Sequence, residues 1–320
     1  MPACRPGGNM ADFRSKFGGL WIDDLDPAAV QAKLAAIADP VLRDQVASLI
    51  RDGYVVIPGG VDHAAIDQYL AEYETAADTP DFFQIEVPMA GGRQTFARDK
   101  TLLPGTKVLD SGMLLPAGPR LSFAPPIRAF LNAVFEDDGL AFQTLHFEVG
   151  STQAIHQDTA YVVVEDEPMR LLASWIALED IQPGSGELIY LVGGHRMAEH
   201  VYADGHSKNW DPPRDGNPPH DAHLAYLRHE AARLGLKQGS FSAKKGDVLI
   251  WHADLPHGGG EITRPGTSRR SLVTHYCPKS NEPHYAGFIP PNWQTRSETR
   301  HGDAYMSLYY PPDRFRVSEA

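Results

Sequence analysis

FQTLHFEVGSTQAIHQDT, residues 142–159, begins as an apolar strand-like run and ends with two potential metal ligands, His156 and Asp158. Side chains alternate along an extended chain, so these two side chains point to one face and Gln157 points to the other. An imidazole and a carboxylate at this spacing can hold the same metal ion. The triplet alone supports a metal site only weakly, because a His-x-Asp pattern often arises by chance.

A second motif strengthens this hypothesis. An expected strand over residues 248–251 leads to His257, which is followed at once by the glycines at 258–260. Glycines let the backbone pass close to a ligand. Two imidazoles and one carboxylate on one side of a metal form the facial triad of non-haem Fe(II) oxygenases, which leaves positions open for a co-substrate and O2. The two motifs together predict a metal site formed by His156, Asp158 and His257.

Two adjacent arginines follow the second histidine, and strand alternation separates them. Arg269 shares one face of an expected strand with Ser271, Val273 and His275, whereas Arg270 faces the other way. An inward guanidinium can hold a carboxylate through two parallel hydrogen bonds. We therefore expect Arg269 to bind a carboxylate and Arg270 to form a salt bridge on the barrel exterior.

The surrounding pattern indicates a mainly β protein with flanking helices. Residues 27–78 carry apolar residues at helical spacing, with Asp26 as the cap and Pro27 as the first position, around a short strand over 54–57. An amphipathic stretch over 127–135 then gives way to strand-like runs separated by Gly, Pro and Asp, which suggests an antiparallel barrel or sandwich. These runs cover residues 142–149, 161–164, 171–178, 188–192, 248–251 and 271–276.

Length and composition favour one domain of a small-molecule enzyme. The chain has 320 residues, 42% of them hydrophobic, and β barrels of this size often stay a single domain. We expect one domain over residues 1–320 with a helical flank over 1–80. The net charge of −12 argues against a nucleic-acid partner, which needs clustered Lys and Arg.

The remaining sequence features exclude further classes. Cys4 and Cys277 are too few for a disulfide framework, and no apolar run is long enough to span a membrane. The N-terminus lacks the apolar segment of a signal peptide. We expect a cytoplasmic protein with a small-molecule substrate and no membrane partner; its oligomeric state stays open.

One long segment interrupts the strands. Residues 200–245 contain Pro-rich stretches at 210–213 and 217–219, followed by an expected helix over 221–236. So long an excursion between strands is usually functional or irregular. Two interpretations stay open for it, a lid over the site and an ordinary surface excursion.

Several stretches resemble the phytanoyl-CoA dioxygenase family of Fe(II)/2-oxoglutarate-dependent oxygenases. They are residues 142–159, quoted above, WIALED at 175–180 and GSGELIYLVGGH at 184–195, and DGYVVI at 52–57 is similar to the family's opening strand. The resemblance covers about residues 45–280. It implies a double-stranded β-helix, a cupin-like jelly roll of two antiparallel sheets.

The resemblance also implies roles for individual residues. The family's HxD pair falls on His156 and Asp158, its distal histidine on His257 and its 2-oxoglutarate arginine on Arg269. Ser271, two residues after that arginine, matches the family's way of holding the distal carboxylate of 2-oxoglutarate. The implied cofactors are Fe(II), 2-oxoglutarate as co-substrate, and O2.

Other residues are weaker candidates. Gln143 shares the more apolar face of its strand, and a buried amide needs a partner, either a carboxylate of the co-substrate or the backbone. Trp175 sits where the family carries a tryptophan beside the iron, although most buried tryptophans are simply core. His252 continues a strand and is not the expected ligand. Solvated side chains are the ordinary expectation for the histidines at 195, 200, 206, 220, 223 and 229.

Asp158 also bears on the reaction. Related halogenases coordinate chloride where their motif has a small residue, so the resemblance favours hydroxylation, coupled to conversion of 2-oxoglutarate to succinate and CO2. Desaturation, epimerisation and oxidative demethylation begin with the same hydrogen abstraction and stay open.

Two other functional classes also stay open. One is a zinc-dependent hydrolase or isomerase on a similar barrel, and the other is a non-catalytic barrel that binds a small molecule. We expect a small metabolite as substrate instead of a CoA ester, because Lys244 and Lys245 form the only doubled lysine.

Overall fold

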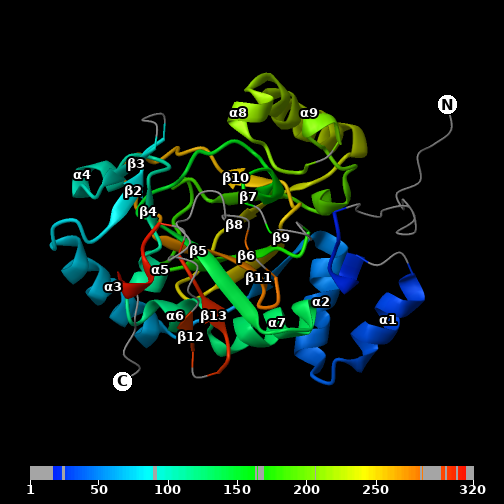
Figure 1. The fold of residues 1–320 in the computed structure, drawn as a ribbon, viewed down its shortest axis with the longest axis horizontal. Helices are drawn as coiled ribbons and strands as arrows, with labels where there is room; N and C mark the ends of the chain where they lie inside the picture. Colours follow the sequence, from blue (N-terminus) through cyan, green and yellow to red (C-terminus); the bar gives the residue numbers. More distant parts are fainter. Residues whose placement is uncertain are drawn as a thin grey trace.

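A computed structural model gives the fold of this chain (Figure 1). It describes residues 17–23, 26–88, 92–162, 164, 169–205, 207–281, 283, 297–299, 301–307 and 309–314. A larger and a smaller β sheet face each other across an apolar layer, and helices cover the outer face of the larger sheet. The expected class, mainly β with flanking helices in a cupin-like jelly roll, is confirmed.

Capped helices form the N-terminal flank. The aspartates at 26, 39 and 62 each accept a hydrogen bond from a backbone amide of the first turn that follows, which satisfies a free donor. The cap predicted at Asp26 is therefore confirmed. The helices before the first long strand are α1 (Pro27–Ala36), α2 (Pro40–Asp52), α3 (His63–Ala77), α4 (Arg98–Thr101), α5 (Ser111–Leu114), α6 (Gly118–Ser122) and α7 (Pro125–Phe135).

The larger sheet runs in the order β1-β9-β6-β11-β5-β4-β2-β3, with neighbours antiparallel, and β13 joins β5 in parallel. Its central strand, β11, pairs with β5 on one side and β6 on the other. The strands are β1 (Tyr54–Ile57), β2 (Gln84–Glu86), β3 (Arg93–Thr95), β4 (Lys107–Leu109), β5 (Gly139–Phe147), β6 (Leu172–Ala177), β9 (Val248–His252), β11 (Ser271–Pro278), β12 (Ser297–Glu298) and β13 (Ala304–Tyr305).

The smaller sheet, β10-β7-β8, lies over the inner face of the larger one. Its strands are β10 (His257–Gly259), β7 (Leu188–Leu191) and β8 (Gln238–Phe241). Alternation along β11 sends Val273 into the layer between the sheets and Leu272 into the layer beneath the helices. The inner layer also contains Trp175 and Trp251 from the larger sheet and Tyr190 from the smaller one.

The segment expected to be an insertion forms two helices beside the smaller sheet, α8 (Pro212–Asp215) and α9 (Pro218–Leu234), at the top of Figure 1. Its last part is strand β8, which belongs to the smaller sheet itself. Leu227 and Ala231 of α9 pack against Leu191 and Met197 in a small buried cluster of their own. Within the described residues, no helix has the length and apolar character needed to cross a membrane.

Most expected elements are present, and one is wrong. Residues 161–164 were expected to form a strand, but Tyr161 lies in a turn and Val164 makes a single bridge to Pro283. Val162 and Val164 are instead buried in a small apolar cluster beside β5. The apolar character of this run therefore indicated that its side chains are buried, but it did not indicate a strand.

Candidate functional site

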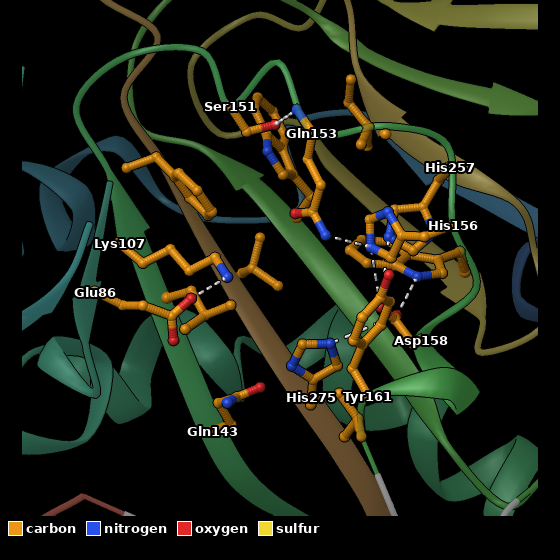
Figure 2. Close-up of a pocket in the computed structure, with 18 of the residues that line it drawn as sticks. Glu86, Lys107, Gln143, Ser151, Gln153, His156, Asp158, Tyr161, His257 and His275 are labelled. Carbon is orange, nitrogen blue, oxygen red and sulfur yellow. Dashed lines mark hydrogen bonds and ion pairs between the residues drawn. The ribbon is translucent and has the colours of Figure 1, made fainter. Parts of the chain in front are cut away.

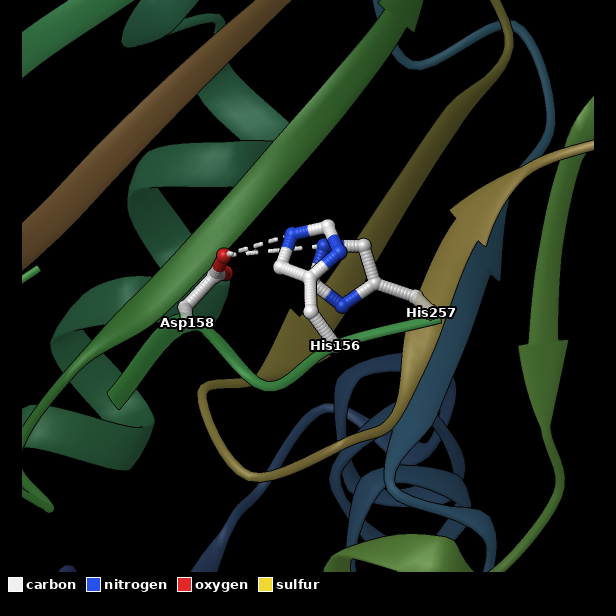
Figure 3. A group of neighbouring side chains, drawn as sticks. All are labelled: His156, Asp158 and His257. Carbon is white, nitrogen blue, oxygen red and sulfur yellow. Dashed lines mark ion pairs between the residues drawn. The ribbon is translucent and has the colours of Figure 1, made fainter. Parts of the chain in front are cut away.

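His156, Asp158 and His257 converge between the two sheets (Figure 3). Each offers one potential ligand atom, and these atoms lie within 4.8 Å of one another. Asp158 Oδ1 lies 3.8 Å from His156 Nε2 and 3.5 Å from His257 Nε2. A metal about 2.1 Å from each ligand, with right angles between them, needs ligand atoms roughly 3 Å apart. The side chains therefore fit one metal ion after small movements.

Backbone contacts hold the two histidines side by side. The amide of each donates to the carbonyl of the other, with both N···O distances 2.9 Å. The two glycines after His257 are needed for this approach, because a Cβ at Gly258 would lie 2.7 Å from the carbonyl oxygen of Gln153. A Cβ at Gly259 would lie 2.5 Å from the amide nitrogen of Thr152.

Both imidazoles present the nitrogen that a metal needs. His156 Nδ1 lies 2.8 Å from the carbonyl of Ala154, and His257 Nδ1 lies 2.9 Å from the carbonyl of Leu255. Each Nδ1 therefore donates its proton to the backbone, which leaves the Nε2 lone pair facing the site. Burial, with the neighbouring His257, lowers the pKa of His156 to about 3, so its imidazole is neutral at pH 7.

The surroundings of Asp158 favour its ionised carboxylate form. Burial by itself would raise its pKa, but the nearby imidazoles of His257 and His275 hold the pKa of this carboxyl well below its usual range. Trp251 Nε1 donates a 2.8 Å hydrogen bond to Asp158 Oδ2, and His275 Nε2 lies 3.5 Å from the same oxygen. Since these groups engage Oδ2, Oδ1 is the atom left to face the histidines.

Three buried polar groups in or beside the pocket have no hydrogen-bond partner among the described residues. Arg269 is 2% exposed, and its Cζ lies 5.5 Å from the ring of Phe147 and 5.6 Å from the ring of Trp175. Among the described residues, Arg269 Nε, Ser271 Oγ and Trp175 Nε1 have no hydrogen-bond partner. We call Arg269, Ser271 and Trp175 the arginine cluster. Because buried polar groups are almost always paired, these free donors fit a bound carboxylate.

The neighbouring arginine differs, as alternation predicted. Arg270 Nε lies 2.9 Å from Glu148 Oε2 on the face of the sheet that the helices cover. Burial lowers the pKa of Arg269 to about 10, against the opposing effect of Glu187, so its guanidinium still carries a charge at pH 7. Of the two arginines, only Arg269 lines the pocket.

The pocket has a volume of about 380 Å³ and is lined by the triad together with Arg269 and Trp175. Figure 2 shows the triad at one side of this pocket. Opposite the triad lie Lys107 and Glu86, which form a 2.8 Å ion pair. Gln143 lines the pocket too, but its amide donates to Tyr309 Oη. This side-chain partner was not considered from the sequence, and a contact between Gln143 and a co-substrate carboxylate stays a prediction.

Several pocket residues escaped the sequence analysis. They are Trp251 and His275, which contact Asp158, and Gln153, whose Nε2 lies 3.2 Å from His156 Nε2. Alternation along β11 does place His275 on the face of Arg269, and this was the one available signal. Neither ring nitrogen of His275 has a hydrogen-bond partner in the described part of the chain.

Two histidines expected to be solvated are buried. His195 packs beneath the first helices, where its Nε2 lies 3.3 Å from the carbonyl of Ile50. His223 of α9 contacts Gln157 and Tyr202. Burial of these two imidazoles is tolerated because each forms hydrogen bonds with segments that are distant in the sequence. His206 lies outside the described residues.

Comparison with known families agrees with this geometry. The family model described as "Phytanoyl-CoA dioxygenase (PhyH)" matches residues 49–271. The chain belongs to this family. Membership makes it an enzyme of the 2-oxoglutarate-dependent oxygenase type that acts on a small molecule. A comparison with the curated proteins gives no significant match.

Solved structures share the fold at low sequence identity. The epimerase SnoN, in complex with Fe3+, alpha ketoglutarate and nogalamycin RO, is 20% identical with a TM-score of 0.58, over 87% of this chain and 98% of that chain. The carbocyclase SnoK from nogalamycin biosynthesis is 18% identical with a TM-score of 0.56, over 78% of this chain and 87% of that chain. EctD from S. alaskensis, with 2-oxoglutarate and 5-hydroxyectoine, is 18% identical with a TM-score of 0.53, over 74% and 76%.

Proposed function

We propose that this protein is an Fe(II)- and 2-oxoglutarate-dependent dioxygenase whose iron ligands are His156, Asp158 and His257. The observation that carries the proposal is a convergent His-Asp-His set in the same pocket as a buried arginine, Arg269, whose Nε has no hydrogen-bond partner among the described residues. When bound, Fe(II), 2-oxoglutarate and O2 supply the oxidation, which converts 2-oxoglutarate to succinate and CO2. The protein supplies binding, orientation and exclusion of water.

Arg269 and Ser271 hold the distal carboxylate of 2-oxoglutarate in this proposal. Both side chains are buried, and Trp175 adds a further free donor beside the guanidinium. A charge-assisted bidentate contact in a dry pocket gives both affinity and a fixed orientation. This orientation directs the keto acid end of the co-substrate toward the triad. A zinc hydrolase, the alternative on such a barrel, gives these three donors no role.

The opposite wall of the pocket supports a small polar substrate. Glu86, Lys107 and Gln143 place polar atoms across the pocket from the triad, and Tyr161 and His275 lie beside Asp158 (Figure 2). A volume of about 380 Å³ suits a small metabolite. A long apolar acyl chain would displace water from these polar groups and offer them no hydrogen bond in return, which is unfavourable.

We infer hydroxylation as the reaction. The carboxylate of Asp158 occupies the position where halogenases leave room for chloride, so halogenation is disfavoured. The fold relatives include an epimerase and a carbocyclase, and those outcomes start from the same hydrogen abstraction. Analysis of the product by mass spectrometry separates hydroxylation, which adds one oxygen atom, from epimerisation, which adds none.

We also propose that the insertion over residues 200–245 covers the mouth of the pocket. The backbone amide of Trp210 donates a 2.9 Å hydrogen bond to the carbonyl of Ala160, and Tyr161 Oη lies 3.0 Å from His220 Nε2. Trp210 and His220 stack with their ring centroids 4.1 Å apart. Because Tyr161 lines the pocket, these contacts support a role for the insertion in excluding water and contacting substrate.

Consumption of 2-oxoglutarate tests the proposed function. The protein is incubated with Fe(II), ascorbate, O2 and 2-oxoglutarate, and succinate is measured with and without each of a panel of small polar metabolites. We expect slow succinate formation without substrate and stimulation by a substrate. A zinc hydrolase or a non-catalytic barrel would form none. Failure to form succinate, together with failure to bind Fe(II) and 2-oxoglutarate in anaerobic titrations, would contradict the proposal.

A further inference from the structure

A buried ion pair links the insertion to both segments that carry the candidate metal ligands. Lys208, from the insertion, is 4% exposed, and its Nζ lies 2.6 Å from Asp254 Oδ2. The other oxygen of Asp254 accepts a 2.7 Å hydrogen bond from Thr159 Oγ1. Thr159 directly follows Asp158, and Asp254 lies in the turn that leads to His257. The lysine therefore reaches both ligand-bearing segments through one carboxylate.

A second set of contacts joins the same three segments. Gln157, the middle residue of the HxD motif, donates from Nε2 to the carbonyl of Asp254 over 2.7 Å. Its Oε1 lies 3.1 Å from His223 Nε2, and His223 Nδ1 lies 2.7 Å from Tyr202 Oη. The amide oxygen can only accept, so His223 carries its proton on Nε2 and accepts the tyrosine hydroxyl at Nδ1. The contacts thus select one tautomer and one orientation of this imidazole.

Burial makes both sets of contacts costly to break. Lys208, Asp254, Gln157 and His223 are each less than a tenth exposed. Burial lowers the pKa of His223 to about 3, which keeps the ring neutral, so the contact with Gln157 is a hydrogen bond between uncharged groups. A buried charge that loses its partner is strongly unfavourable, so Lys208 and Asp254 hold each other in place.

We propose that the inner edge of the insertion is a positioning element for the metal site. Lys208 and His223, which we call the clamp, fix the segment carrying His156 and Asp158 against the turn that leads to His257. The inference rests on the proposed function, since it requires the triad to bind metal. Outer contacts that orient ligands change metal affinity by about 10- to 100-fold, and the clamp belongs to this class. The outer part of the insertion remains free to contact substrate.

Metal titration of the protein tests the clamp without depending on turnover. Metal-free protein is titrated with Co(II), whose visible absorption reports both affinity and ligand geometry. His223→Phe removes the contact with Gln157 and leaves no buried charge behind. We expect it to weaken Co(II) binding by about 10- to 100-fold and to change the absorption spectrum. His223→Gln keeps an amide donor and should restore the wild-type spectrum.

A second variant and a matched control complete the experiment. Lys208→Met removes the charge at nearly constant length and should weaken Co(II) binding in the same direction. Arg214→Met removes an exposed cation of the insertion, one that pairs with Asp215 at 2.7 Å and does not reach either ligand-bearing segment. We expect this control to bind Co(II) as the wild-type protein does.

Each outcome decides for or against the clamp. Wild-type affinity and spectrum in both His223→Phe and Lys208→Met would overturn it. A lower unfolding temperature with unchanged Co(II) binding would also overturn it, because the contacts would then be merely structural. If Lys208→Met does not fold, His223→Phe and its rescue by His223→Gln decide alone. Failure of the wild-type protein to bind Co(II) would overturn the proposed function itself.

Discussion

The two faces of β11 and of the residues just before it carry similar polar side chains, but these side chains are hydrogen-bonded on one face and lack described partners on the other. On the face beneath the helices, Arg270 pairs with Glu148, and Thr274 Oγ1 lies 3.0 Å from the hydroxyl of Ser122. On the pocket face, Arg269 Nε and Ser271 Oγ are buried and have no partner among the described residues. Folding normally pairs buried polar groups. This face of the sheet is therefore the one that we propose a ligand completes.

The same contrast separates two histidines near β9 and gives the largest expected effect. His252 Nε2 lies 3.2 Å from Asp23 Oδ2, whereas His257 belongs to the triad. We expect His257→Ala to abolish succinate formation and His252→Ala to retain most of it. The fold has a large core apart from the triad, so circular dichroism should show both variants folded. Full activity in His257→Ala, with His252→Ala inactive, would reverse the assignment.

The arginine pair gives the next largest effect. Arg269→Ala should raise the dissociation constant for 2-oxoglutarate about a hundredfold, because losing a buried charged partner costs about 3 kcal/mol. Arg270→Ala should leave that constant within a few-fold of the wild-type value. Anaerobic titration with Fe(II) present measures both. Equal and mild effects at the two positions would show that the faces of β11 do not differ in ligand binding.

We expect the hydrogen-bonded face of β11 to stabilise the fold, and the pocket face to bind 2-oxoglutarate. Burial alone would raise the pKa of Glu148, but the hydrogen bond and charge of His146, with the guanidinium of Arg270, lower its pKa to about 2. A depressed carboxyl pKa stabilises the fold above the unfolded-state value of about 4.3, and that stabilisation is lost as pH falls toward 2.

Glu148→Gln tests this assignment. We expect it to lower the free energy of unfolding by about 2 kcal/mol at pH 7, with little change in 2-oxoglutarate affinity. The difference from wild type should stay constant above about pH 5 and shrink between about pH 4 and 2. Urea unfolding at several pH values measures it. A difference independent of pH down to pH 2 would rule out ionised Glu148 as the source.

The parts of this candidate site that depend on local geometry could be predicted from the sequence. Period-two alternation separated Arg269 from Arg270. The spacing of His156 and Asp158 predicted that their side chains lie on one side of an extended segment. The glycines after His257 indicated a close backbone approach. The structure agrees, because a Cβ at Gly258 would lie only 2.7 Å from the carbonyl oxygen of Gln153. Each of these inferences needs only a few neighbouring residues.

Contacts that form when the sheets close could not be predicted in this way. Trp251 donates to Asp158 across 93 residues, and Gln143 donates to Tyr309 across 166. His223 becomes buried only because α9 folds back onto the HxD segment. Strands β2, β3 and β4 have three residues each, too few for an alternating pattern to stand out. The fold class was predictable because the longer strands each carry their own pattern.

The smallest expected effect compares two hydroxyls on opposite faces of β11. Ser271→Ala removes a buried hydroxyl that has no partner in the part of the chain that the structure describes, so the free energy of unfolding should stay unchanged or rise slightly. It should weaken 2-oxoglutarate binding by about tenfold, because a hydrogen bond to a charged group contributes about 1.5 kcal/mol. Thr274→Val breaks a satisfied hydrogen bond at similar volume, which should cost about 1 kcal/mol of stability and leave 2-oxoglutarate binding unchanged. Loss of stability in Ser271→Ala, or loss of binding in Thr274→Val, would show that the pairing of polar groups does not separate the binding face of this strand from the structural one.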